Sequence, residues 1–204
     1  MTKPLREKTT SVYALGRAPD NQQERFRSPL NLRWLDNIPS SIGYYLAGFA
    51  DGEGSFTASL RKKRDYKNEW QISLAFNVAQ RDVSTLKLFK QHLKCGRLQC
   101  RSDGVHYFVV GDYPSLQNHV VPFFDRYQIL SENKRKNFLI FKKITSLVYQ
   151  KKHLTHNGMK TVLELREELN KGKGRKRRYF IGDVIEESST TTRRTRSIER
   201  EDMV

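Results

Sequence analysis

Nine residues, Leu46 to Gly54, join a helix of small residues to a strand, and this junction constrains the fold more than any other feature of the chain. They read Leu-Ala-Gly-Phe-Ala-Asp-Gly-Glu-Gly, and an alternating segment starts at Ser55. Glu53 therefore lies between two glycines, where a helix is predicted to end. A carboxylate there faces the negative end of the helix dipole, which costs about 0.3–1 kcal/mol. An acid in such a position indicates a cation as its partner.

The chain is strongly basic, with a net charge of +16 over 204 residues. Most of this excess falls within residues 40–170, the part predicted to fold, and this distribution favours a polyanionic partner. No apolar run approaches the roughly 20 residues that a membrane helix needs, and the N-terminus lacks the apolar core of a signal peptide. Cys95 and Cys100 fall on opposite faces of a predicted strand, so a disulfide is not expected. We therefore expect an intracellular protein with no membrane partner.

Three segments differ in composition and periodicity. Residues 1–38 are predicted to be an extended or disordered N-terminal arm, residues 39–170 the folded domain, and residues 171–204 a basic, low-complexity tail. Apolar periodicity within the domain predicts, in order, helix 41–51, strands 53–63 and 69–80, helix 83–94, strands 96–102 and 105–110, a helix from Asp112 to about Pro122, and helices 132–149 and 158–170. This order predicts an α+β fold in which helices cover one face of a four-stranded antiparallel sheet.

The other face of this sheet is predicted to be polar with almost no acidic side chains. A half-solvated sheet has a polar outer face in any case, so alternation alone does not assign a function. Arg, Gln, Asn, Ser and Thr side chains, however, can hydrogen-bond base edges in a DNA major groove. We expect DNA contacts from Ser55, Thr57, Ser59, Arg61, Gln71, Ser73, Asn77, Arg97, Gln99, Arg101 and His106.

Small residues recur along the first predicted helix at Gly43, Ala47 and Ala50, with Gly48 beside them. This spacing lets two helices approach closely. The second helix can belong to the same chain or to a second copy related by a two-fold axis. In the second case two Glu53 carboxylates meet, and they need a cation between them to stay ionised. Oxygen ligands at such a place suit Mg²⁺ and a two-metal phosphodiester hydrolysis.

Leu46 to Gly54 resembles the motif that names the LAGLIDADG homing endonucleases, and Ser55-Phe56 continues the pattern of that family into its first strand. Phe76 to Gln80 resembles the end of the second strand in its single-motif members, and Lys134 to Phe138 the basic start of their late helix. Only one copy of the motif is present, and single-motif members act as homodimers. The resemblance implies an αββαββα domain with a saddle-like sheet, and Gly43, Ala47, Gly48 and Ala50 as its dimer interface.

The resemblance also implies site residues. Glu53 matches the metal-binding acid, Gly52 the neighbour whose carbonyl adds a ligand, Gln80 a residue that orients water, and Lys134 the basic residue of the catalytic pocket. A strand-end polar residue and a solvated helix-start charge are the alternatives for Gln80 and Lys134.

The chain also departs from the family pattern. Some members have an arginine four residues after the glutamine, where this chain has Ser84, and Arg81 is our candidate substitute and a further DNA contact. Asp51 precedes the turn, so we assign it a capping or supporting role, with direct coordination of metal as the alternative.

The predicted function is that of a sequence-specific homing endonuclease that cuts both strands of an intronless target. The cofactor would be Mg²⁺, with Mn²⁺ as an expected substitute. The partners would be a long pseudo-palindromic DNA duplex, a second copy of the chain and, in some settings, the host intron RNA. The setting would be a bacterial cytoplasm or an organelle that holds the intron. The alternatives are an intron RNA maturase, a catalytically inactive regulator of the same fold, and a basic ribosome-associated protein, against which the acidic helix terminus counts.

Overall fold

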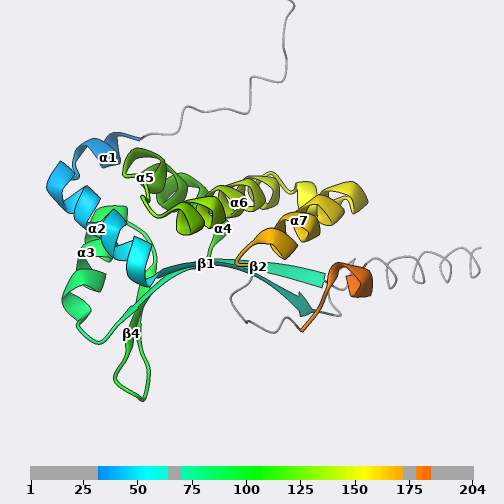
Figure 1. Cartoon of the computed structure of the whole chain (residues 1–204), viewed down its shortest axis with the longest axis horizontal. Coiled ribbons are helices and arrows are strands. Elements are labelled where there is room, and N and C mark those ends of the chain that lie inside the picture. Colours follow the sequence, from blue (N-terminus) through cyan, green and yellow to red (C-terminus); the bar gives the residue numbers. More distant parts are fainter. Residues whose placement is uncertain (1–31, 64–69, 172–177, 185–204) are drawn as a thin grey trace, which may run out of the picture. The chain divides into compact units, whose positions relative to one another are not determined.

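The computed structural model describes residues 32–63, 70–171 and 178–184, and the structural findings refer to these ranges. A four-stranded antiparallel sheet forms the centre of the domain, with the strand order β1-β2-β4-β3. The strands are β1 (Gly54–Lys62), β2 (Trp70–Gln80), β3 (Arg97–Cys100) and β4 (His106–Val110). The sheet is curved, and its concave side is left open (Figure 1).

The helices lie on the convex side of the sheet (Figure 1). They are α1 (Arg33–Asp36), α2 (Ser40–Glu53), α3 (Val83–Leu93), α4 (Tyr113–Ser115), the π-helix η2 (Leu116–Val120), α5 (Val121–Arg126), α6 (Glu132–Tyr149), the 3₁₀ turn η3 (Lys152–Leu154) and α7 (His156–Glu168). This arrangement confirms the predicted α+β fold with helices on one face. No helix in the described ranges has the length and apolarity that a membrane crossing requires.

Alternation along β2 separates the two faces of the sheet. Trp70, Ile72, Leu74, Phe76 and Val78 are buried under the helices, whereas the residues between them are half-buried. An aromatic cluster fixes the helices to this face, since the Phe56 ring lies 5.2–5.5 Å from four other rings, those of Phe76, Phe124, Phe138 and Phe141. Contacts of this kind add to the stabilisation from burial alone.

Two of the predicted helix starts are confirmed by their caps. The carboxylate of Asp82 accepts a hydrogen bond from Ser84 N (2.8 Å), and that of Asp112 accepts one from Ser115 N (2.8 Å). The predicted end near Pro122 is wrong, because the helical path continues to Arg126. Pro122 lies in the first turn of α5, where a residue without an N–H is tolerated.

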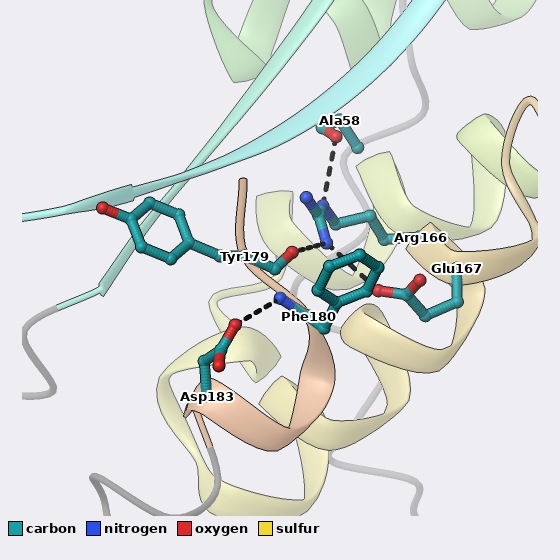
Figure 2. Close-up of polar contacts among 6 residues, drawn as sticks. All are labelled: Ala58, Arg166, Glu167, Tyr179, Phe180 and Asp183. Carbon is teal, nitrogen blue, oxygen red and sulfur yellow. Dashed lines mark hydrogen bonds and ion pairs between the residues drawn. The ribbon is translucent and has the colours of Figure 1, made fainter. Parts of the chain in front are cut away.

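The buried core extends beyond the predicted limits of 39–170. Leu35 and Ile38 are buried before it, and Val184 is buried after it. Figure 2 shows how the later segment is attached: the guanidinium of Arg166 donates to the carbonyls of Ala58 (3.3 Å) and Tyr179 (3.0 Å). The rest of the predicted arm and tail lies outside the described residues.

β1 is an edge strand, so one side of its backbone has no neighbouring strand. In an antiparallel pair, alternate residues turn their polar backbone groups to that side. Side chains from the helical layer supply donors to three successive carbonyls of this set: Gly54 accepts from Lys134, Phe56 from Asn170 (2.8 Å) and Ala58 from Arg166 (3.3 Å). The first half of this edge, from Gly54 to Ala58, is therefore covered by side chains.

Candidate functional site

A groove of about 770 Å³ lies on the open face of the sheet. Its lining comes from the end of α2 and from all four strands or the residues that follow them: Glu53, Ser55, Thr57, Asn77, Ala79, Gln99, Cys100, Arg101, Tyr107 and Val109. Only Glu53 and Arg101 among these carry a charge. The groove is thus a polar surface with one acid at the end where α2 meets β1.

The predicted contacts on β1 and β2 share this open face. Strand pairing sets Ser55 opposite Asn77, Ser59 opposite Ser73, and Arg61 opposite Gln71. The hydroxyl of Thr57 donates to the Ala75 carbonyl (3.2 Å), and that of Ser59 to the Ser73 carbonyl (3.4 Å). These hydroxyl oxygens remain able to accept hydrogen bonds from a ligand.

His106 does not lie on the open face with Arg97, Gln99 and Arg101. It falls in the same alternate set of β4 as Phe108 and Val110, which are buried under the helices, and its Nδ1 lies 3.0 Å from the Arg81 carbonyl. The pairing of Gln99 with Tyr107 brings Tyr107 to the open face instead. The prediction shifted β4 by one position, which reverses the face of every side chain in a strand.

Tyr107, which the sequence did not single out, fixes the arginine at this end of the groove. Arg101 Nη1 donates to the Tyr107 hydroxyl (3.0 Å), and its Nη2 forms an exposed ion pair with Asp103 (3.3 Å). The hydrogen bond to Tyr107 and then the charge of Asp103 raise the pKa of Arg101 above its usual value. The guanidinium is therefore held in place as a permanent positive charge on the open face.

The two acids of the Leu46–Gly54 segment have different surroundings. Asp51 Oδ2 accepts from Leu130 N (3.2 Å) and Ser131 N (2.8 Å), and Oδ1 accepts from the Ser131 hydroxyl. Partial burial alone would raise the pKa of Asp51, but these hydrogen bonds and the Lys134 ammonium outweigh it and hold that pKa below its usual value. Asp51 thus joins the end of α2 to the two residues before α6, which fits the supporting role of the two that were expected.

Glu53, by contrast, is exposed and lines the groove. Within the described ranges no hydrogen bond or ion pair occupies its carboxylate. Of the two acids, only Glu53 therefore offers carboxylate oxygens to a ligand at the open face.

Lys134 and Gln80 reach the same end of the sheet. Lys134 lies in the first turn of α6, and its Nζ donates to the carbonyl of Gly54, the residue after Glu53. Gln80 ends β2, two positions beyond Val78, which pairs with Gly54. Its Oε1 accepts from Arg81 N (2.8 Å), so its amide nitrogen is the group left to donate to a ligand.

Arg81 is exposed at this end of β2, as its assignment as a substitute basic residue requires. The backbone N–H of Arg81 donates to Gln80 Oε1, and the carbonyl of Arg81 lies 3.0 Å from His106 Nδ1. Ser84 donates its N–H to Asp82 as part of the α3 cap. Arg81 therefore combines a fixed backbone with an exposed side chain, whereas Ser84 belongs to the start of α3.

The donors that could hold a metal are all oxygens. The Glu53 carboxylate is one, and the Gly52 carbonyl, in the last turn of α2, is one of the four that a helix end leaves without an intrahelical donor. This donor set fits Mg²⁺. In the part of the chain that the structure describes, no three His, Cys, Asp or Glu side chains gather into one metal site. The remaining ligands of such a metal would have to come from water, from a phosphate or from another chain.

The small residues of α2 do not form the exposed ridge that was predicted. Gly43, Ala47 and Ala50 are buried within the chain, and a Cβ on Gly43 would lie 2.3 Å from the ring of Tyr127. Their assignment to a dimer interface is therefore wrong: the close partner belongs to the same chain. Gly48 alone of the four predicted residues is exposed, and a Cβ added there would meet no atom of the described residues within 4 Å.

Comparison with known proteins finds similarity to endonucleases. Residues 46–145 match a family model described as LAGLIDADG endonuclease. The chain is 35% identical over 143 residues to the probable intron-encoded endonuclease 2 of Neurospora crassa, a match that covers 68% of this chain and 30% of that relative. It is 25% identical over 111 residues to the homing endonuclease I-ApeII of Aeropyrum pernix, covering 53% of this chain and 65% of that one.

Solved structures of homing endonucleases are also similar to this chain. The archaeal intron-encoded homing endonuclease I-Vdi141I, in complex with DNA, superimposes with a TM-score of 0.69 at 26% identity, and the match covers 74% of this chain and 96% of that chain. The chain spans about a quarter to a third of the length of the first curated relatives that it matches.

Proposed function

Because the chain belongs to the LAGLIDADG endonuclease family, we propose that it is a homing endonuclease that cuts both strands of a DNA duplex at a specific site. One observation carries this proposal: an exposed acid, Glu53, stands at the end of a polar groove on the open face of the sheet. A groove without the acid would bind DNA, and an acid without the groove would have no substrate beside it.

The open face supplies the DNA contacts. Amide and hydroxyl side chains of β1 and β2 are spaced along the strands to meet base edges, and Arg61, Arg97 and Arg101 provide bidentate donors for guanine or phosphate. The fold carries this surface on a sheet, so its side chains are fixed relative to one another. The net charge of +16 adds the non-specific attraction to the DNA backbone.

Glu53, with the Gly52 carbonyl, would hold a Mg²⁺ ion, for which Mn²⁺ would substitute. When bound, such an ion stabilises the charge that develops on the phosphate and lowers the pKa of water. The Lys134 ammonium bonds the carbonyl of Gly54, the residue after Glu53, and from there it would stabilise negative charge on the phosphate. Gln80 donates its amide N–H to a water or phosphate oxygen at the same end.

A duplex has two strands, so a second copy of the chain is needed to cut both at one dyad. We place the contact on the exposed side of α2, where Tyr44 (61% exposed) and the two open glycines, Gly48 and Gly52, lie in successive turns. Leu130, 87% exposed, adjoins this surface because its N–H donates to Asp51. The two Glu53 residues would then meet near the dyad, and the phosphate would complete both metal sites.

The test uses the purified full chain and duplexes that carry the uninterrupted junction of the host gene, or a randomised duplex library if that junction is unknown. We expect cleavage of both strands with Mg²⁺ and none with EDTA. Glu53→Gln should abolish cleavage and leave the dissociation constant for DNA within a few-fold. Glu164→Gln, which alters an exposed acid on α7, is the matched control. Cleavage at the normal rate by Glu53→Gln would show that the metal site lies elsewhere. In the cell, the proposed endonuclease would act in the compartment that holds the intron.

A further inference from the structure

We propose that Asp51 is a positioning residue of this active site, which ties the end of α2 to the start of α6 so that Lys134 stands beside Glu53. The inference rests on the proposed endonuclease function. It concerns an acid that has no place in the binding of metal or DNA, because its oxygens are already occupied by donors from the same chain.

The tie spans about 80 residues of sequence and joins two elements at their ends. Asp51 lies in the last turn of α2, and its three donors come from Leu130 and Ser131, immediately before α6. Both carboxylate oxygens take part, so the bond fixes a direction as well as a distance. α6 thus begins at a point set by α2.

The N-cap residue of α6 takes part in this contact and does not cap its own helix. Ser131 is its N-cap, a residue that usually accepts a hydrogen bond from its own helix, yet it makes no such bond. Its hydroxyl donates to Asp51 instead. The caps of α3, α4 and α7, by contrast, are residues that accept from their own helices, as Asp112 does from Ser115. At α6 the N-cap side chain therefore bonds the end of α2 and makes no capping bond to its own helix.

Lys134 closes the arrangement into a ring. It lies three residues after Ser131, and its Nζ bonds the Gly54 carbonyl. Gly54 follows Glu53, which follows Asp51 by two positions, so the path returns to its start. A ring of this size leaves α6 little freedom to slide along α2. A displacement of about 1 Å between catalytic groups can lower a rate by two orders of magnitude.

The first experiment compares single variants on the DNA duplex that the wild-type chain cleaves. Asp51→Ala should lower kcat at least tenfold and change KM and the DNA dissociation constant less than threefold. Asp51→Asn, which keeps one acceptor oxygen of the same shape, should recover part of the loss. The matched control is Asp112→Ala, which removes a cap of another helix and should leave kcat unchanged. An Asp51→Ala enzyme with normal kcat would overturn the inference, as would a variant in which only KM changes.

A double-mutant cycle shows whether Asp51 acts through Lys134. In a Lys134→Met background, Asp51→Ala should lower kcat by less than threefold, because the group that it positions is already gone. Losses that multiply would contradict the inference. If Asp51→Ala fails to fold, the cycle is run with Asp51→Asn, whose amide exchange at Ser131 should be faster than in the wild type.

The outcome separates this inference from the proposed function. A wild-type chain that cleaves no duplex, or a Glu53→Gln variant that cleaves normally, removes the proposed function and the inference with it. Normal cleavage by wild type, loss with Glu53→Gln and normal kcat with Asp51→Asn and Asp51→Ala remove the inference alone.

Discussion

The two faces of α2 both carry small residues, but only the small residues of one face have a partner among the described residues of the chain. On the inner face, Gly43 lies against Tyr127, and Ala47 and Ala50 are buried beneath neighbouring side chains. On the outer face, a Cβ added to Gly48 or Gly52 would have no described atom within 4 Å. The same residue types therefore serve two different purposes on one helix.

The inner face is small because an aromatic ring occupies the space. Tyr127 is 2% exposed, its hydroxyl donates to the Ile38 carbonyl (3.2 Å), and its ring lies edge-on to Tyr44 at 5.3 Å. Nothing of this kind in the described ranges explains the outer face, where each glycine in the helix costs up to about 1 kcal/mol relative to alanine. A face that stays small without such a partner is what the proposed contact with a second copy would require.

The largest effect is expected on the inner face. Gly43→Ala adds a methyl group 2.3 Å from the Tyr127 ring, which is 2% exposed. We expect the free energy of unfolding to fall by about 1–3 kcal/mol, as for other overpacked cores. Urea denaturation followed by circular dichroism measures this loss. An unchanged midpoint would mean that the ring yields easily, and the contrast between the faces would lose its basis.

Gly48→Glu probes the outer face at the level of assembly. It places like charges across the proposed dyad, which opposes association. We expect the dimer dissociation constant, measured by sedimentation equilibrium, to rise at least about tenfold. The stability of the monomer should change by no more than about 0.5 kcal/mol, since the site is exposed. Gln91→Glu adds one negative charge at another exposed helix position and should leave the constant unchanged; equal dissociation constants for both variants would argue against this interface.

Gly48→Ala is expected to have the smallest effect, and its sign opposes that of Gly43→Ala. At a concentration where the wild type is monomeric, replacement of a helical glycine at an open position should raise the free energy of unfolding by about 0.5–1 kcal/mol. Thermal denaturation of the two alanine variants under the same conditions makes the comparison. A loss of stability in both would show that the outer face also has a partner within the chain.

Local patterns were sufficient to predict most of the elements. Alternation defined β1 and β2 and the residues of their open face, and Asp82 and Asp112 marked helix starts that the structure confirms. The motif between Leu46 and Gly54 predicted Glu53 at the end of the first helix, and the structure has it there, exposed and lining the groove.

The features of the site that the sequence missed share one cause, which is contact between distant segments. Nothing near Gly43 indicates that Tyr127 will fill the space beside it, and nothing near Asp51 identifies Ser131 as its donor. The sheet face on which His106 lies depends on the register in which β3 and β4 pair after their turn. Periodicity describes a single element, whereas these features arise when elements pack.

The capped edge of β1 limits how copies of this chain can associate. A sheet with an open edge can add strands from other molecules without end, and such growth produces linear polymers. Here Lys134, Asn170 and Arg166 occupy the carbonyls of Gly54, Phe56 and Ala58, three of those that an incoming strand would need. Strand addition at the covered part of β1 should therefore begin only after α6 and α7 separate from the sheet.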